Sequence, residues 1–492
     1  MGLERETKLQ VPPGFRLPDL GGDGLEAVEQ PVERLVTIYV DTPDLRIARW
    51  GSSLRHRRGE GWTVKLPAPD EGSLLARMEH VFDGDDPRKL PVAAADLVSA
   101  FVRGAELAPV ARLHTRRAGV QVRDELGRAI AQVTDDEVSV MDGRRVATRF
   151  REVEVELDPS TSSDVAEALV ARLREAGAGP VDNVSKLRRA LGPRAEEAPD
   201  VVVEDLDEDA TVADVVRGAL AASAVRLLTR DAGVRIGEDP EDVHQARVAT
   251  RRLRSDLRTF RDFLDPAWAK PLRDELKGLG SALGAVRDAE VLRDRLRSRL
   301  SGLPDADRAA GEALIDRLET TRAEARDGLL ATMREPRYVE LLDAIVASAR
   351  TPRVLDEFAS SPGLKAFGAV LDAPWKHLEA AIDGARQETS DEALHNARIR
   401  AKRVRYAAEA VAPVFGKTAR RFAEAAADLQ DVLGEHQDAV VAGAWLREAR
   451  SGGHAFVAGQ LAAFETTAAR TARDEWPAAW KALSRKRLRF WT

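Results

Sequence analysis

Two short segments of the chain place charged side chains at every second position. ERETK near the start does so with Glu4, Glu6 and Lys8, and EVEVE at 152–156 does so with three glutamates. Alternate side chains of a β-strand share one face. Carboxylates gathered on one face are oxygen ligands that suit Mg²⁺ or Mn²⁺, although each strand taken alone is more typical of a solvated face.

Basic side chains show the same alternation in other strand-like segments. They are Arg55, Arg57, Lys65, Arg77, Arg112 and Arg116. A closed barrel with a charged lumen requires such sorting, because carboxylates on one wall can hold a metal while Lys and Arg on the other neutralise phosphates. Phosphoryl transfer in such a site needs positioning and charge neutralisation rather than a covalent nucleophile.

The elements that would position these residues are antiparallel strands. β-branched alternation predicts strands at 35–40, 61–66, 118–124, 131–140 and 151–157, with one helix at about 160–176. Residues 194–210 are strongly acidic and predict a linker, in which 201–203 could form a short docked strand. From residue 211 onward, Ala, Leu, Arg and Glu recur with a helical period, which predicts an all-α domain over 211–492.

The helical half repeats internally. HQARVATRRLR at 244–254 returns as HNARIRAKRVR at 395–405, and LGAVRDAEV at 283–291 returns as LGEHQDAVV at 433–441. The spacing between the paired motifs is nearly the same in both copies. We therefore expect two related units, about 211–350 and 351–492, related by a pseudo-twofold axis.

Each repeat begins with a cationic helix face. At about 100° per residue, arginines spaced three and four apart from position 244 fall in one stripe, opposite an apolar face. Like charges at this spacing destabilise a helix, and a polyanionic partner would relieve them. A solvated arginine face is the alternative. The two histidines that begin the stripes either join this surface or cap their helices.

Composition excludes several classes of protein. The chain has 492 residues, 75 Lys and Arg against 82 Asp and Glu, and no cysteine. The length predicts more than one domain. Without cysteine there are no disulfides and no thiolate metal sites or nucleophiles. We expect a cytoplasmic protein without a membrane segment, and an association with polyphosphate granules is a further expectation.

The first 190 residues resemble the CYTH superfamily, the triphosphate tunnel metalloenzymes. The ExExK signature is present as 4–8, and the supporting motifs follow in family order at 39–43, 54–57, 63–65, 77–79 and 152–156. The resemblance implies a barrel tunnel with catalytic Glu4, Glu6 and Lys8 that binds Mg²⁺ or Mn²⁺. The implied metal ligands are Glu4, Glu6, Asp135, Glu152, Glu154 and Glu156. The implied phosphate contacts are Lys8, Arg55, Arg57, Lys65, Arg77, Arg116 and Lys186.

The chain departs from the family pattern in two places. Val81 stands where many members have a further acidic residue, and His114 replaces the usual Lys before Arg116. These departures bear on the substrate more than on the fold.

Residues 211–492 resemble the CHAD domain, a helical module that often follows a CYTH domain and is associated with inorganic polyphosphate. In the second repeat Lys402 replaces an arginine of the motif. The resemblance implies a polyphosphate-binding set of His244, Arg247, Arg251, Arg252, Arg254, Arg258, His395, Arg398, Lys402, Arg403 and Arg405. Nucleic acid is not expected there, because the stripes lack interleaved aromatic residues.

The sequence thus predicts an α+β chain of two domains. A CYTH-like antiparallel β-barrel tunnel spans 1–193 and an all-α CHAD-like bundle with a pseudo-twofold repeat spans 211–492. We expect a metal-dependent triphosphatase acting on inorganic triphosphate or a related triphosphate, with polyphosphate bound on the helices. A polyphosphate-binding or targeting protein without turnover, and an adenylate cyclase using the same tunnel, are the alternatives.

Overall fold

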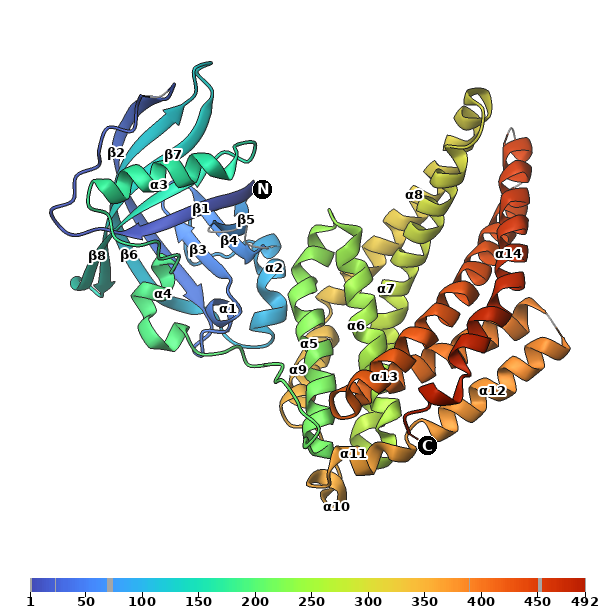
Figure 1. The fold of residues 1–492 in the computed structure, drawn as a ribbon. Helices are drawn as coiled ribbons and strands as arrows, with labels where there is room; N and C mark the ends of the chain where they lie inside the picture. Colours follow the sequence, from blue (N-terminus) through green and yellow to red (C-terminus); the bar gives the residue numbers. More distant parts are fainter. Residues whose placement is uncertain (1, 23, 69–73, 389, 450–453, 492) are drawn as a thin grey trace. The chain divides into compact units, whose positions relative to one another are not determined.

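The computed structural model describes residues 2–22, 24–68, 74–388, 390–449 and 454–491. The chain divides into two compact units, residues 1–200 and 201–492. The first is built from strands and the second from helices (Figure 1). The predicted two-domain fold is therefore confirmed, and each unit is described by itself.

The first unit is a closed antiparallel barrel of eight strands. Around the barrel the order is β1-β5-β4-β3-β2-β6-β7-β8, and β8 pairs again with β1. The strands are β1 (Gly2–Gln10), β2 (Glu26–Asp41), β3 (Ser53–Arg57), β4 (Gly61–Pro67), β5 (Leu75–Phe82), β6 (Ala108–Arg123), β7 (Ala129–Asp142) and β8 (Arg145–Leu157).

The outer face of the barrel supplies one hydrophobic core. Leu9 of β1 and Val153 and Val155 of β8 are buried against Leu169 and Leu173 of helix α3 (Ser163–Glu175), which lies across the barrel (Figure 1). These residues alternate with the charged residues of ERETK and EVEVE. Burial of the apolar positions against α3 therefore turns the charged positions toward the lumen.

Short helices complete this unit. They are α1 (Arg46–Arg49), α2 (Val92–Val102), α4 (Lys186–Leu191) and η1 (Gly192–Ala195). Helix α4 begins at Ser185, whose hydroxyl accepts a hydrogen bond from the Arg188 amide at 3.3 Å. Leu187 packs into a cluster with Leu113 and Val138. That packing fixes the position of Lys186, the residue before it.

The second unit contains long helices in pairs. Its elements are α5 (Val212–Ile236), α6 (Pro240–Thr259), η2 (Arg261–Phe263), α7 (Pro266–Leu300), α8 (Asp305–Arg334), α9 (Pro336–Arg350), α10 (Asp356–Ala359), α11 (Gly363–Ala366), η3 (Phe367–Ala369), α12 (Asp372–Gln387), α13 (Asp391–Glu448), α14 (Ala455–Leu483) and η4 (Lys486–Leu488). No helix in these described ranges is both long enough and apolar enough to cross a membrane.

The helices repeat in order, as the sequence motifs predict. Helices α5 to α8 of the first repeat correspond to α12, the two halves of α13, and α14 of the second. Gly416 breaks α13 with a φ of 62°, where the first repeat has the turn between α6 and α7. In the first repeat α7 packs against α8, and in the second α13 packs against α14 (Figure 1).

The predicted linker is docked at both of its ends. Trp50 donates a hydrogen bond from Nε1 to Asp200 at 2.9 Å, and Arg103 forms a buried ion pair with the same carboxylate. On the helical side Glu204 binds Arg217 at 2.8 Å. Residues 201–203 form no strand. The boundary between the units therefore falls inside the predicted linker, after residue 200.

Candidate functional site

The lumen of the barrel holds a polar cavity of about 320 Å³. Most of its charged lining comes from β1, β3, β4, β5 and β8, with further residues from helix α4. Its charged lining residues are Glu4, Glu6, Lys8, Arg55, Arg57, Glu60, Lys65, Arg77, Glu79, Arg117, Glu154, Glu156, Lys186 and Arg188. The structure thus brings most of the predicted tunnel residues to one cavity.

Register between β1 and β8 sets the acidic wall. Glu6 lies opposite Glu156, and Lys8 lies opposite Glu154. Residues directly opposite in an antiparallel pair have Cβ atoms about 5 Å apart. Like charges facing each other at this distance repel, so this wall favours a cation between the strands.

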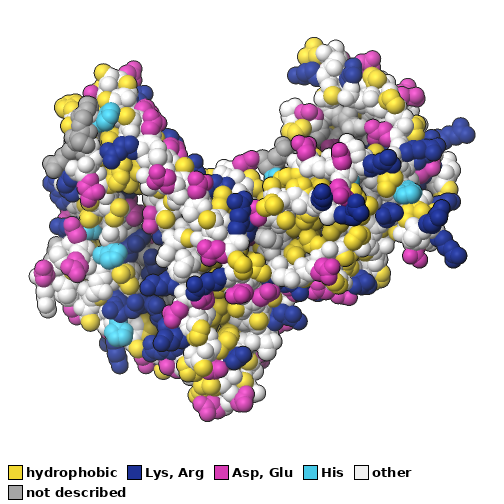
Figure 2. All heavy atoms as spheres, turned by 180° about the vertical axis from the view of Figure 1, so that it is seen from behind, with side chains coloured by type: hydrophobic (Ala, Val, Ile, Leu, Met, Phe, Trp, Pro, Cys, Tyr) yellow, Lys and Arg dark blue, Asp and Glu magenta, His cyan; other side chains and the backbone are white. Residues whose placement is uncertain are grey.

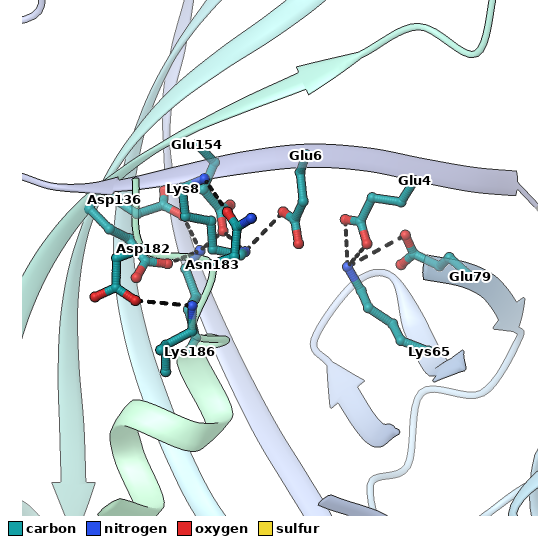
Figure 3. A network of polar contacts seen from close by, with 12 residues as sticks. Glu4, Glu6, Lys8, Lys65, Glu79, Asp136, Glu154, Asp182, Asn183 and Lys186 are labelled. Carbon is teal, nitrogen blue, oxygen red and sulfur yellow. Dashed lines mark hydrogen bonds and ion pairs between the residues drawn. The ribbon is translucent and has the colours of Figure 1, made fainter. Parts of the chain in front are cut away.

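Lysines neutralise most of these glutamates in the structure. Lys8 Nζ lies 2.9 Å from Glu6 and also pairs with Glu154 (Figure 3). Lys65 Nζ lies 2.5 and 2.6 Å from the two oxygens of Glu4. A ligand carrying both a metal and phosphates would exchange partners with these ion pairs.

Lys186 joins three carboxylates at the inner end of the cavity. Its Nζ lies 2.7 Å from Glu154, 2.8 Å from Glu152 and 2.9 Å from Asp136. Burial alone would lower the pKa of Lys186, but the three carboxylates outweigh it and raise that pKa. Burial alone would raise the pKa of Glu154, but the positive charges of Lys186, Lys8 and Arg117 outweigh it. The pKa of Glu154 therefore lies well below the usual value.

Glu156 is in a different electrostatic environment. Its side chain reaches solvent, yet the barrel wall and nearby carboxylates surround it. Partial burial, and then the charges of Glu4 and Glu6, raise its pKa to about 7. Glu156 can therefore gain or lose a proton near neutral pH.

The acidic wall fits a divalent cation by the chemistry of its donors. Glu4, Glu6, Glu154 and Glu156 line one cavity and offer only oxygen ligands, as Mg²⁺ and Mn²⁺ prefer. Among the described residues, no three acidic or histidine side chains are close enough together to hold a metal as they stand. Because lysines occupy the carboxylates, metal binding requires those side chains to move.

Three predicted lumen residues, Arg112, Arg116 and Asp135, face the outside instead. Arg116 and Asp135 are one position away from Arg117 and Asp136, which face inward and pair at 2.7 Å. Arg116 is half exposed, and Asp135 binds Arg151 at 2.6 Å on the outer side. The assignment of Arg116 and Asp135 to the lumen is corrected to Arg117 and Asp136, because one residue of register reverses the face of a strand.

Glu152 lies on the lumen side of β8, as predicted, but its carboxylate is not exposed to the cavity. Its side chain is fully buried and binds Lys186 and Arg189, the latter at 3.1 Å. It lies outside the lining of the cavity. Glu152 therefore positions Lys186 and Arg189, two of the three basic side chains of α4, rather than facing a ligand.

In the helical unit the two arginine stripes meet between α6 and α13. A cavity of about 160 Å³ is lined by Arg251, Arg254 and Arg258 from α6 and by Lys402 and Arg403 from α13. We call this surface, together with Arg247 and Arg398, the interhelical groove. Lys and Arg side chains gather in a hollow over the helical unit (Figure 2).

Lys402 lies among other cations in the interhelical groove, which disfavour its charged form. Burial, and then Arg251, Arg398 and Arg247 in that order, lower its pKa to about 7. His244 lies in the same field, because burial and then Arg287, Arg251 and Arg247 lower its pKa. An anion bound here would relieve this repulsion.

Glycines let the arginines lie against the helices behind them. A Cβ added to Gly284 of α7 would lie 3.6 Å from Arg247 Nε, and one added to Gly434 of α13 would lie 3.5 Å from Arg398 Nε. The two contacts are related by the repeat.

The repeat is not symmetric in charge. Position 409 of the second repeat corresponds to Arg258 of the first and is a glutamate. Glu409 binds Arg252 at 2.7 Å and Arg405 at 2.8 Å. Arg252 and Arg405 lie outside the lining of the interhelical groove cavity. Two of the predicted polyphosphate-binding arginines are thus held by an internal carboxylate.

Comparison with known proteins follows the same division. A CYTH domain matches residues 2–191 and a CHAD domain matches residues 218–447. Two uncharacterized proteins of Mycobacterium tuberculosis, from strains CDC 1551 / Oshkosh and ATCC 25618 / H37Rv, are each 32% identical over 482 residues, covering 89% of this chain and 87% of the relative.

Two solved structures are similar to part of this chain. The CHAD domain from the plant Ricinus communis is 26% identical, with a TM-score of 0.48, covering 58% of this chain and 96% of that one. PptA from Streptomyces chartreusis is 24% identical, with a TM-score of 0.47, covering 55% of this chain and all of that one.

Proposed function

Because the chain belongs to the family of proteins that join a CYTH domain to a CHAD domain, we propose that its barrel hydrolyses a short linear phosphate chain and that its helices bind inorganic polyphosphate. The substrate would be inorganic triphosphate or a related triphosphate. The enzyme would then be a triphosphatase, a hydrolase of phosphoric anhydrides.

The observation that carries this proposal is the pairing of cations with carboxylates in one cavity. Lys8 and Lys65 are held by glutamates of β1 and β8, while Arg55 and Arg77 line the same space. Lysines and arginines can transfer from carboxylate to phosphate without leaving the cavity. A phosphate chain carrying a cation would therefore find both kinds of partner already in place.

The lining favours an inorganic chain over a nucleotide. Among the described lining residues the only aromatic ring is that of Tyr39. A bound purine would gain from stacking and apolar contact, which this cavity scarcely offers. We therefore expect tripolyphosphate to be a better substrate than ATP.

Glu4, Glu6, Glu154 and Glu156 would hold Mg²⁺ or Mn²⁺. Such an ion neutralises phosphate charge and orients water when it is bound. The chain itself would supply the remaining chemistry. Arg55, Arg57 and Arg77 would spread the developing charge, and a glutamate beside the metal would accept the proton of the attacking water.

The interhelical groove supports the second half of the proposal. Arginines from both repeats converge there away from Glu409, the carboxylate that holds Arg252 and Arg405. Arg247, at the edge of the groove, pairs with Asp288 at 3.0 Å. Clustered guanidinium groups suit a polyphosphate chain. Nucleic acid remains the weaker partner, because Tyr406 is the only aromatic residue among the described residues that line this cavity.

One experiment separates this proposal from its alternatives. The full-length protein would be incubated with tripolyphosphate, ATP or thiamine triphosphate in Mg²⁺ or Mn²⁺, and the products resolved by chromatography. Release of phosphate from tripolyphosphate supports the triphosphatase. Cyclic AMP with pyrophosphate from ATP would identify a cyclase. Binding of all three substrates without any product would leave a binding protein.

A further inference from the structure

The outer wall of the barrel carries a basic surface that the lumen does not use. Helix α3 and the segment after β1 cover this wall as far as Val133 and Val153. The next row is exposed on β2, β6 and β7, and on β8 it ends in the partly buried Arg151. In register it reads Arg34, Arg116, Glu137 and Arg151, and the row beyond it reads Val36, His114, Ser139 and Arg149.

These rows line a cavity of about 990 Å³, larger than the 320 Å³ of the lumen. Gln10, Val11 and Pro13 form its side. Arg151 is held at the edge, where its Nη1 donates to the Pro13 carbonyl at 2.8 Å. We call Arg34, His114, Arg116, Arg149 and Arg151 the outer basic surface.

Positive charge exceeds negative charge on the outer basic surface. Arg151 is neutralised by Asp135 at 2.6 Å, whereas the ion pair that Arg116 makes with the half-exposed Glu137 is long, at 3.5 Å. Arg34 lies directly opposite Arg116 and takes part in neither pair. Two arginines facing each other across antiparallel strands are destabilising. A bound anion would remove that cost.

We propose that the outer basic surface binds a linear phosphate chain, as a site separate from the lumen and from the interhelical groove. Neighbouring strands are about 4.8 Å apart and successive rows about 6.8 Å apart, so the arginines form a grid of cations along an extended ligand. Each guanidinium can bind phosphate oxygens in a bidentate manner.

A phosphate chain is favoured over nucleic acid. Apart from His114, the only aromatic side chain in the lining of this cavity, within the described part of the barrel, is Phe150. Base stacking along a strand requires several such platforms. Arg189 of α4 also lines this cavity, but Glu152 and Asp182 hold its guanidinium. The residues of the outer basic surface all lie on strands, so the site would exist whether or not the lumen hydrolyses a substrate.

Arginine labelling with phenylglyoxal and peptide mass spectrometry tests the site in the full-length protein. Long-chain polyphosphate should reduce labelling of Arg34, Arg116 and Arg149 several-fold. It should leave labelling of Arg88, a side chain 88% exposed on the loop after β5, unchanged. The same protection should persist in Arg251→Ala/Arg398→Ala, which removes two cations of the interhelical groove.

Binding measured in that groove variant gives a second readout. Arg34→Ala/Arg149→Ala should lower polyphosphate affinity and reduce the salt dependence by about two counterions, whereas Arg88→Ala/Arg128→Ala should not. The proposal is overturned by equal labelling with and without polyphosphate, or by equal affinities of the two double variants. Protection by single-stranded RNA but not by polyphosphate would also overturn it, and would assign the surface to nucleic acid.

Discussion

Glu6 of β1 and Glu156 of β8 lie directly opposite each other in the barrel, and both face the lumen. The ion pair from Lys8 reaches Glu6 and Glu154. Glu156 gains little from it, because the nearby carboxylates still raise its pKa. The structure therefore places a carboxylate whose pKa is raised across from one that a lysine already holds, and the predictions for the lumen follow from this arrangement.

Glu6→Gln should reduce metal-dependent tripolyphosphate hydrolysis by at least about a hundredfold, because it removes one anionic oxygen ligand from the acidic wall. The barrel should stay folded, since the amide has the same shape. Phosphate release at limiting Mn²⁺ and circular dichroism would measure both effects. Glu26→Gln, an exposed position at the start of β2, is the matched control. Activity of the Glu6 variant within a few-fold of the control would remove Glu6 from the ligands.

Metal affinity should depend on pH through Glu156. Its pKa of about 7 lies above the ordinary value for glutamate, so the folded protein holds a proton there that the metal must displace. Below pH 7 the affinity should fall about tenfold per pH unit, and above pH 7 it should level off. Calorimetric titration with Mn²⁺ on both sides of pH 7 would show this. In Glu156→Gln the affinity should be weaker and nearly independent of pH.

Arg117→Ala should raise the KM for tripolyphosphate, because this guanidinium lines the lumen beside Glu154 and Asp136. Arg112→Ala on the same strand is the control, since Arg112 is exposed on the outer face. Steady-state kinetics of the two variants would test the corrected register. Equal KM values would show that Arg117 does not contact the substrate.

Polyphosphate affinity should fall as pH rises through about 7, because Lys402 loses its proton there. A bound polyanion favours the charged lysine, so binding takes up a proton. Lys402→Arg should bind with little pH dependence, and Lys402→Met should bind more weakly at every pH. Filter binding across this pH range at constant salt would compare them. A wild-type protein without pH dependence would rule out Lys402 as a ligand.

Asp200→Asn should destabilise the barrel unit by about 3 kcal/mol, because Asp200 is the carboxylate partner of a buried ion pair with Arg103. The same contact predicts that a fragment ending at residue 200 is more stable than one ending at residue 195. Thermal unfolding of both fragments would measure the difference. If the two fragments unfolded at the same temperature, the contact between Asp200 and Arg103 would not stabilise the barrel unit.

The sequence predicted the barrel and the helical repeat because their patterns are long. Alternation over 4–8 and 152–156 specifies which residues face inward, and burial of Leu9 and Val155 on the opposite face follows from it. The repeated motifs at 244–254 and 395–405 specified the pairing of α6 with α13 in the same way. Each pattern spans enough residues that one residue departing from it does not change the predicted strand face or helix pairing.

The errors arose where charged residues occur in doublets. Arg116 and Arg117 are identical in type, as are the acids Asp135 and Asp136, so composition does not show which member faces inward. Register shifts at 30/33 and 39/40 in β2 interrupt the alternation of side chains, so counting every second residue does not give the face there. Because Arg117 pairs with Asp136, the two misassignments are one error of register.

One asymmetry could have been found by counting. Moving each position of the first stripe forward by 151 residues converts His244 to His395 and Arg247 to Arg398, but it converts Arg258 to Glu409. The sequence alone therefore shows that the charge at this position is reversed between the two repeats. Its consequence, the removal of Arg252 and Arg405 from the interhelical groove, required the three-dimensional contacts.

The glycines behind Arg247 and Arg398 have a consequence for hydration. A guanidinium that rests on a bare helix backbone keeps its charged edge in water but has lost water from one flat face. An arriving anion then has fewer water molecules to displace, and the side chain has fewer rotamers to lose. At Gly284 and Gly434 a methyl group would already be in van der Waals contact with the guanidinium, so a longer side chain pointing the same way would compete with the arginine for this space. Gly284 and Gly434 thus affect both the hydration and the side-chain mobility of Arg247 and Arg398.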